Sequence, residues 1–200
     1  MKGIILLNGA PYGGEIDADN ALVYCCDGAY KWAKGKVRID KNLGDFDSLE
    51  ETPYPAPDEI YPSEKNFTDG EIALHKLLEN GVDGIEIYGG GGGREDHFLG
   101  NLQLLYAALK SGKPAAMYTD NTEIYAVSGK IRLGKYKTAT FSVLPFGGTV
   151  HIMDYRGLKY DYPETLSYGE CRGISNIVES ADAYLEVKGF ALVIINRGKV

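Results

Sequence analysis

The first part of the chain contains short apolar runs that stop just before a glycine or an aspartate. These runs show no alternation of polar and apolar positions, which is typical of strands covered on both faces in a parallel sheet. They are Gly3–Leu7, Ala21–Cys26, Ile85–Tyr88 and Ala115–Tyr118. Two stretches repeat apolar residues at the spacing of a helix face; they carry Ala73, Leu74, Leu77 and Leu78, and Leu99, Leu102, Leu105 and Leu109. Strands that alternate with helices predict a parallel α/β domain.

The first of these helices has a start and a stop that are readable from the sequence. Thr68-Asp69-Gly70-Glu71 is a capping box, with Thr68 as the N-cap residue and Glu71 three positions later. Gly81 is placed to end the helix.

The pattern changes after about Asp120, where helical periodicity stops. Short strand-like pieces punctuated by glycine follow, which predicts an all-β sandwich or barrel. The pieces are Glu123–Val127, Lys137–Leu144, Val150–Met153, Ala183–Val187 and Ala191–Ile195. We therefore expect two domains, an α/β domain over residues 1–121 and a β-sandwich over residues 122–200.

Composition narrows the class of protein. Hydrophobic residues make up 44% and charged residues 24%, as in an ordinary globular chain. The formal net charge of -7 argues against a protein that neutralises a nucleic-acid backbone. No apolar run reaches the ~18 residues of a membrane span. The three cysteines form neither a disulfide framework nor a zinc-ligand spacing. We expect a protein that binds neither nucleic acid nor a membrane and that resides in a reducing cytoplasm.

The stretch around Gly89–Gly93 is the strongest candidate for a functional loop. Five glycines follow the apolar run ending at Tyr88, and Arg94-Glu95-Asp96-His97 then opens the second helix. A strand that passes through a glycine loop into a helix places backbone N–H groups beside a helix N-terminus, which favours phosphate-like anions. A flexible surface turn would be enough to explain two or three glycines. No Gly-Lys-Ser/Thr sequence closes the loop, so it is not a Walker A motif.

Carboxylates supply the second candidate feature. Asp45 and Asp47 follow Gly44, and two carboxylates at the end of a parallel strand repel unless a cation such as Mg²⁺ lies between them. The alternative is a solvated turn in which Asp47 or Ser48 caps the next helix.

The remaining charged candidates each have a plain structural explanation as well. Asp69 suits the first turn of a helix, and Lys65 either faces phosphate or is simply solvated. Arg94 could fork onto phosphate oxygens, and Asp96 could bind a metal or accept a proton.

Taken together, the motifs resemble those of the thiamine pyrophosphokinase family in its bacterial form. They are, in family order, Asp27-Gly28-Ala29, Gly44-Asp45-Phe46-Asp47-Ser48, Glu64-Lys65-x-x-Thr68-Asp69-x-Glu71, Gly92-Gly93-Arg94-x-Asp96-His97-x-x-x-Asn101, Gly157-Leu158-Lys159-Tyr160 and Ser175-Asn176. Two features depart from the family pattern. Asn66 stands where the bacterial motif usually has aspartate, and the loop Gly89–Gly93 consists of glycine alone, whereas the family's loop usually contains other residues too.

The resemblance implies a Rossmann-like parallel α/β domain followed by a β-sandwich, working as a homodimer. It implies transfer of the diphosphoryl group of ATP to thiamine, giving thiamine diphosphate and AMP. The implied catalytic residues are Asp45, Asp47, Asp69, Arg94 and Asp96, the first three holding Mg²⁺. The implied ATP-binding residues are Asp27, Gly28, Lys65, Thr68, Gly92, Gly93 and His97, and Ser175 with Asn176 would face thiamine.

Two other functions fit parts of the pattern. A non-enzymatic nucleotide or cofactor sensor would bind its ligand without forming AMP. A phosphatase with an aspartate nucleophile would hydrolyse a phosphate donor without an acceptor, but the polar lead-in Asp40-Lys41-Asn42 is a poor strand for that chemistry.

Overall fold

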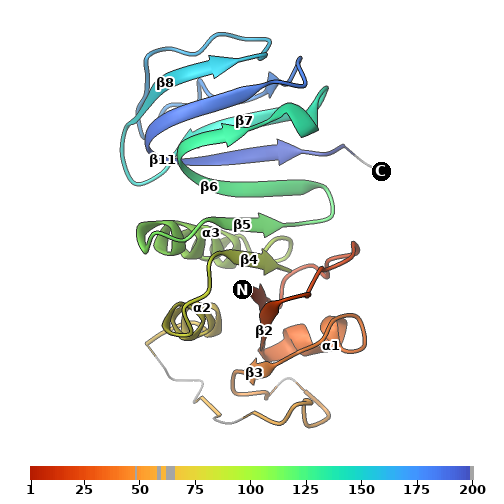
Figure 1. Ribbon diagram of the computed structural model, residues 1–200. Coiled ribbons are helices and arrows are strands. Elements are labelled where there is room, and N and C mark those ends of the chain that lie inside the picture. Colours follow the sequence, from red (N-terminus) through yellow and green to blue (C-terminus); the bar gives the residue numbers. More distant parts are fainter. Residues whose placement is uncertain (48, 58–59, 62–65, 199–200) are drawn as a thin grey trace. The chain divides into compact units, whose positions relative to one another are not determined.

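The computed structural model describes residues 1–47, 49–57, 60–61 and 66–198 (Figure 1). The chain divides into two compact units, Met1–Asp120 and Asn121–Val200. Within the described ranges, no helix combines the length and the apolarity that crossing a bilayer requires.

The first unit contains the predicted parallel sheet. Its strands are β1 (Lys2–Leu6), β2 (Ala21–Cys26), β3 (Lys41–Leu43), β4 (Ile85–Tyr88) and β5 (Ala115–Tyr118), in the order β5-β4-β1-β2-β3. Each neighbouring pair is parallel. The chain first adds strands on one side of β1 and then crosses to add β4 on the other side. That reversal opens a crevice at the carboxyl ends of β1 and β4.

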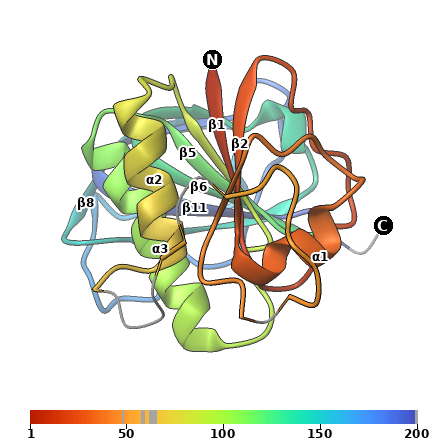
Figure 2. The ribbon, with the colours of Figure 1, turned by 90° about the horizontal axis from the view of Figure 1, so that it is seen from below.

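Helices cover both faces of this sheet. Helices α2 (Asp69–Glu79) and α3 (Glu95–Lys110) lie side by side on one face, and the short α1 (Tyr30–Ala33), preceded by the 3₁₀ turn η1 (Asp27–Ala29), lies on the other (Figure 2). Burial on both faces explains why the strands read as continuous apolar runs. Cys25 and Cys26 are buried in β2, as expected for small apolar fillers, and burial raises the pKa of the Cys25 thiol to about 12.

The polar lead-in before Gly44 forms the short strand β3, which pairs with β2 and includes Asn42. Asp45 and Asp47 therefore follow a parallel strand, as expected from the sequence. The Asn42 side chain is only 2% exposed and donates a hydrogen bond from Nδ2 to the Pro55 carbonyl at 2.8 Å. A partner thirteen residues away, invisible in the local pattern, lets a polar residue occupy a buried strand position.

The second unit is an antiparallel β-sandwich. Its strands are β6 (Thr122–Arg132), β7 (Thr140–Pro145), β8 (Val150–Arg156), β9 (Thr165–Leu166), β10 (Asn176–Ile177) and β11 (Tyr184–Asn196), with the 3₁₀ turn η2 (Gly134–Tyr136) between β6 and β7. The central strand β11 pairs with β6 along its length, with β8 through its first half and with β7 through its second half. Phe141, Val143, Val150, Leu185 and Val193 are among the residues of its core.

The strand β11 corrects the prediction of two strands separated at Gly189. The predicted segments Ala183–Val187 and Ala191–Ile195 fall in one strand, which begins at Tyr184 and has a register shift between Val187 and Ala191. Gly189, at φ +106°, lies inside that shift, and a Cβ there would meet the Thr149 carbonyl oxygen at 2.7 Å. A glycine bulge lets a strand bend and change partners without ending.

A buried carboxylate ties together the start of the sandwich. Glu123 is 7% exposed and accepts hydrogen bonds from the hydroxyls of Tyr125 and Tyr136, which lie 2.7 Å from each other. An Arg197 nitrogen lies 3.5 Å from the same carboxylate. The charge is therefore partnered on several sides, as a buried charge must be to persist.

We predict that Glu123→Ala lowers the free energy of unfolding by about 2–3 kcal/mol, because two phenol hydroxyls lose a charged acceptor. The matched control is Glu186→Ala, which removes an exposed cross-strand ion pair with Lys130 at 3.2 Å. That change should cost no more than about 1 kcal/mol. Urea denaturation followed by circular dichroism measures both. Equal losses in the two variants would contradict a structural role for the Glu123 cluster.

Candidate functional site

A cavity of about 1350 Å³ opens in the first unit where the strands end. Four segments that follow strands contribute to its wall: Leu7–Ala10 after β1, Asp27 after β2, Asp45 and Asp47 after β3, and Gly90, Gly92 and Gly93 after β4. The first turns of α2 and α3 complete this part. The crevice predicted by the strand order therefore exists, and the sequence-predicted acids and glycines line it.

The loop after β1 and the glycine loop are joined through their backbones. The N–H groups of Leu7, Gly9 and Ala10 donate to the carbonyls of Tyr88, Gly89 and Gly91 at 2.8, 2.8 and 2.7 Å. The side chain of Asn101 in α3 donates to the Gly90 carbonyl at 2.8 Å. The carbonyls of Gly89, Gly90 and Gly91 therefore all accept hydrogen bonds. By contrast, the N–H groups of Gly92 and Gly93 donate to no other residue in the described part of the chain.

The close contact between the two loops requires glycine at several positions, a role that the sequence did not reveal. A Cβ on Gly9 would lie 2.5 Å from two carbonyl oxygens of the glycine loop, and a Cβ on Gly89 would lie 2.3 Å from the Leu7 carbonyl oxygen. Gly92 has φ +67° and would meet Ala10 at 2.6 Å. Only Gly93 has open space around it. Most of the glycines are therefore required for close loop packing, and not only for access by a ligand.

Three carboxylates converge on the other side of the cavity. Ligand atoms of Asp27, Asp45 and Asp47 all lie within 4.8 Å of one another. Asp27 and the intervening Phe46 have φ angles of +44° and +57°, conformations that cost energy in residues other than glycine. One Asp27 oxygen, Oδ1, is buried and has no hydrogen-bond partner among the described residues.

This cluster suits a hard divalent cation. Like charges at such distances raise each other's energy unless a cation is shared, and carboxylate oxygens are the ligands that Mg²⁺ prefers. The unsatisfied Asp27 oxygen is the kind of donor that a cation would use. The group differs in one member from the metal set implied by resemblance, because Asp27 joins Asp45 and Asp47 while Asp69 does not.

The start of α2 forms the third part of the wall. The capping box is confirmed: the Glu71 N–H donates to Thr68 Oγ1 at 3.2 Å, and the Thr68 N–H donates to Glu71 Oε2 at 2.8 Å. The Thr68 hydroxyl also donates to Glu71 Oε2 at 3.1 Å, so its side chain is already engaged in capping the start of the helix. Asp69 lines the cavity from the first helical position. Lys65 lies outside the described residues.

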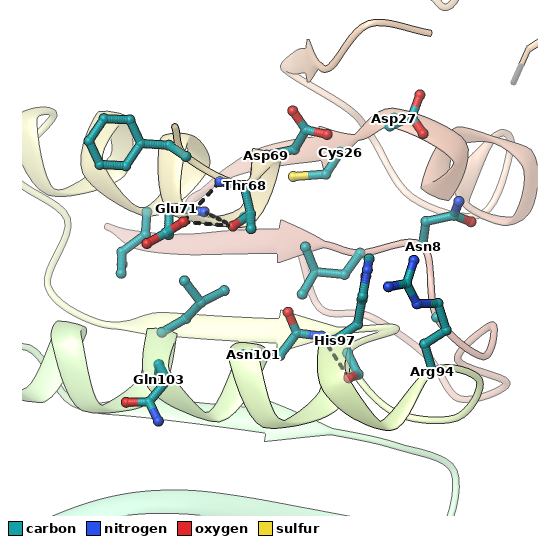
Figure 3. Close-up of a pocket in the computed structure, with 18 of the residues that line it drawn as sticks. Asn8, Cys26, Asp27, Thr68, Asp69, Glu71, Arg94, His97, Asn101 and Gln103 are labelled. Atoms are coloured by element: carbon teal, nitrogen blue, oxygen red, sulfur yellow. Dashed lines mark hydrogen bonds between the residues drawn. The ribbon is translucent and has the colours of Figure 1, made fainter. Parts of the chain in front are cut away.

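Arg94 and Asp96 form an exposed, forked ion pair at the start of α3. Arg94 donates from Nε and Nη2 to the two Asp96 oxygens at 3.1 and 2.6 Å, and the His97 N–H donates to Asp96 Oδ1 at 3.0 Å. The hydrogen bonds from Arg94 lower the pKa of Asp96. Arg94 and His97 point into the gap below Asp69 and Cys26 (Figure 3). Asp96 is therefore better suited to orienting Arg94 than to accepting a proton.

The two residues expected to face thiamine lie in the second unit and differ from each other. Asn176 is 4% exposed and its amide clamps Tyr160, accepting from its N–H at 3.1 Å and donating to its carbonyl at 2.8 Å. Ser175 is exposed, has φ +64°, and its N–H donates to Ser142 Oγ at 3.1 Å. Asn176 thus has a structural task, whereas the Ser175 side chain is open to a ligand.

Several cavity residues were missed by reasoning from the sequence. They are Asn8, Ala10, Cys26, Phe67, Gly100, Gln103, Tyr106 and Lys110. A usable signal existed for Asn8, because Asn8-Gly9 follows β1 just as Asp27-Gly28 follows β2. No local signal marks Gly100, which reads only as a weak point in a helix.

The fold and cavity define a class of protein. A parallel α/β domain with carboxylates on one side of a strand-end crevice, and an arginine and glycine amides on the other, is built to bind an anionic ligand together with a cation. A β-sandwich follows in the same chain. This is the general design of an α/β phosphate-handling enzyme with an added β domain.

Comparison with known proteins specifies the family. The family model described as "Thiamin pyrophosphokinase, catalytic domain" matches residues 15–117, and "Thiamin pyrophosphokinase, vitamin B1 binding domain" matches residues 129–189. The thiamine pyrophosphokinase of Bacillus subtilis is 32% identical over 162 residues, which are 76% of each chain. The chain therefore belongs to the thiamin pyrophosphokinase family.

Solved structures agree with this assignment. The crystal structure of thiamine pyrophosphokinase from Bacillus subtilis superposes with a TM-score of 0.83 at 26% identity, covering 99% of this chain and 100% of that one. The thiamin pyrophosphokinase from Candida albicans gives a TM-score of 0.71 at 18% identity, covering 98% and 89%. The second likeness supports the fold alone.

The carboxylate cluster leads to a prediction about metal binding. Asp27→Asn should weaken Mg²⁺ binding by about tenfold or more, because it removes one charged oxygen donor from the site. Asp69→Asn is the matched control from the same cavity and should change Mg²⁺ affinity less. Isothermal titration calorimetry with Mg²⁺ measures both variants. If Asp69→Asn weakens binding as much as Asp27→Asn, the cation is held by a different set of oxygens.

Proposed function

We propose that this protein transfers the diphosphoryl group of ATP to the hydroxyl group of thiamine, giving thiamine diphosphate and AMP. Membership of the thiamin pyrophosphokinase family makes the chain an enzyme of this kind, and a non-enzymatic sensor is not favoured. The observation that supports the proposal best is the cavity itself. It joins the carboxylate cluster, the glycine loop and Arg94 within the unit that the catalytic family model matches.

The roles of the residues follow from the charge of the triphosphate. Arg94 is exposed and already presents a planar fork, so exchanging the Asp96 carboxylate for phosphate oxygens needs only a small rearrangement. The N–H groups of Gly92 and Gly93 and the N-terminus of α3 add further donors for the anion. Asp27, Asp45 and Asp47 would hold Mg²⁺, which supplies positive charge to the phosphate oxygens when bound.

The reaction forms one bond and breaks one. The hydroxyl oxygen of thiamine attacks the β-phosphorus of ATP, the bond from that phosphorus to the oxygen bridging it to the α-phosphate breaks, and AMP leaves. The hydroxyl proton is lost to solvent or to a phosphate oxygen. Asp96 would orient Arg94 before the phosphate binds, and the reaction would proceed by positioning and charge stabilisation without an assigned general base.

The proposal also covers what the two units do. The Rossmann-like description of the first unit is supported by its strand order, and residues 1–121 would bind ATP and Mg²⁺. Residues 122–200 would bind thiamine, which the match to a vitamin B1 binding model supports. The homodimer stays a prediction from the family resemblance. Ser175 would contact thiamine, while Asn176 would shape the site by holding Tyr160. The cytoplasmic location stays a prediction from the cysteine content.

The reaction type can be tested by its products. With ATP, Mg²⁺ and thiamine, the protein should form AMP and thiamine diphosphate in equal amounts, because one diphosphoryl group moves per turnover. Liquid chromatography of the quenched mixture separates all four products of interest. Formation of ADP and thiamine monophosphate would refute diphosphoryl transfer, and saturable binding without either product pair would support a sensor.

The acceptor site can be tested at Ser175. Ser175→Ala should raise the Michaelis constant for thiamine several-fold, since a lost hydrogen bond to a ligand costs about 0.5–1.5 kcal/mol. The Michaelis constant for ATP should stay nearly unchanged. Ser180→Ala, in the same unit, is the control, because the Ser180 hydroxyl already pairs with Asp182. A shift in the ATP constant instead would remove Ser175 from the acceptor site.

A further inference from the structure

The chain contains a single tryptophan, Trp32, which contacts the loop after β1 from behind the cavity. Trp32 belongs to α1, on the face of the sheet opposite α2 and α3 (Figure 2), and it does not line the cavity. Its indole Nε1 donates a hydrogen bond to the Leu7 carbonyl at 3.1 Å. Leu7 lines the cavity and is 7% exposed. The indole therefore reaches a wall residue of the site through that residue's backbone.

The same ring lies beside the first residue of the glycine loop. Gly89 has φ +71°, and a Cβ added there would lie 2.9 Å from Trp32 Cζ2 as well as 2.3 Å from the Leu7 carbonyl oxygen. At this point the two loops are already joined, because the Leu7 N–H donates to the Tyr88 carbonyl at 2.8 Å. Trp32 thus contacts both loops where their backbones meet. A shift of the indole would leave the Leu7 carbonyl unpaired with it and would open space beside Gly89.

The indole is itself held in a fixed place. It is half-buried and packs against the core cluster that lies under α1. Lys36 Nζ lies 5.9 Å from the centroid of the Trp32 ring and 5.8 Å from that of Tyr12, distances at which a cation is attracted to a ring face. Lys36 also donates a hydrogen bond to the Tyr12 carbonyl. Trp32 and Lys36 therefore hold the loop after β1 at two backbone carbonyls, those of Leu7 and Tyr12.

The glycine loop needs such support from outside. Five consecutive glycines have more conformational freedom than any other sequence of that length, so neighbouring groups must select one arrangement. The loop after β1 and Asn101 hold its carbonyls. Any apolar side chain could fill the space under α1, whereas of the apolar side chains only tryptophan adds an N–H donor to a ring. The donor is directed at the junction of the two loops and not at solvent.

We propose that Trp32 is a positioning residue for the reaction. Its ring and N–H hold the junction of Leu7 and Gly89, so that the N–H groups of Gly92 and Gly93 stay directed at the triphosphate. This inference rests on the proposed use of ATP. Trp32 touches no ligand, and its effect passes through the loop backbones. A looser junction leaves the loop in its binding arrangement for a smaller fraction of the time, and the apparent affinity falls by that fraction.

The test compares two variants of α1 that each lose one hydrogen bond to the backbone. Trp32→Phe keeps a ring but removes the N–H that the Leu7 carbonyl accepts. The matched control is Tyr30→Phe: Tyr30 is 4% exposed, and its hydroxyl accepts from the Tyr54 N–H at 3.1 Å, away from both loops. The ligand is α,β-methylene-ATP with Mg²⁺, which cannot be cleaved at the bond that the reaction breaks. It is titrated calorimetrically into the whole protein.

Trp32→Phe should weaken binding of the analogue by about three- to tenfold, because the junction loses a hydrogen bond and its carbonyl partner is left unpaired. The Michaelis constant for ATP should rise by a similar factor, while that for thiamine should change by less than about twofold. Tyr30→Phe should bind the analogue as the wild type does. Thermal unfolding should show a lowered melting temperature in both variants, so a purely structural role of Trp32 would not separate them.

A second measurement uses the wild type alone. If the indole contact raises the affinity for the ligand, the ligand must strengthen the indole contact by the same factor, because coupling between two sites is reciprocal. Trp32 is the only tryptophan, so its fluorescence is read directly. Saturating α,β-methylene-ATP with Mg²⁺ should therefore reduce the quenching of this fluorescence by acrylamide. Tyr30→Phe retains Trp32 and should show the same reduction.

Three outcomes would overturn the proposal. They are unchanged affinity for the analogue in Trp32→Phe, an equal loss of affinity in Tyr30→Phe, and acrylamide quenching that is the same with and without the ligand. The proposed reaction can fail separately. A wild type that makes AMP and thiamine diphosphate, together with a Trp32→Phe variant that binds normally, rejects only the role of Trp32. A wild type that shows the expected contrast between the variants without making AMP keeps that role and rejects the reaction.

Discussion

The backbone hydrogen bonds between the loop after β1 and the glycine loop after β4 fix the rest of the site. They occur where the strand order reverses, so they bridge a gap that would otherwise separate β1 from the start of α3. Gly9 and Gly89 are needed because any Cβ would push the two backbones apart. With the loops joined, Arg94 at the start of α3 is held on the cavity that Asp27 also lines. Ligand chemistry at this edge therefore depends on glycine packing more than on any single charge.

Backbone strain and charge repulsion are concentrated across the cavity from these hydrogen-bonded loops. Asp27 and Phe46 have left-handed backbone angles, and three carboxylates share a small volume. Neither feature improves the stability of the free protein, because positive φ angles and like charges both cost energy. A fold retains such costs where a ligand removes them, and a shared cation would offset the repulsion and satisfy the buried Asp27 oxygen. The strain and the unsatisfied oxygen support the same conclusion from independent observations.

Local signals were predictable from the sequence, and contacts between distant segments were not. The capping box at Thr68 and the strand runs depend on neighbours a few residues away, so their patterns were readable. The side chain of Asn42 can be buried in β3 because it donates a hydrogen bond to the Pro55 carbonyl. Asp27 lies close to Asp45 because β2 pairs with β3. The membership of a site is set by which strands lie side by side, and a single sequence does not state that order. The sequence suggests that the glycines of the loop admit a ligand, whereas the structure shows that most of them are needed for close packing of the loop.

The position of Gly100 separates two reasons for which a helix contains glycine. Where helices must touch, glycine removes a clash, and Gly70 against Leu104 is that case. Where nothing touches, the lost helix propensity has no compensation within the protein. Gly100 is such a position: it is exposed, it lines the cavity, and a Cβ there would meet no atom within 4 Å.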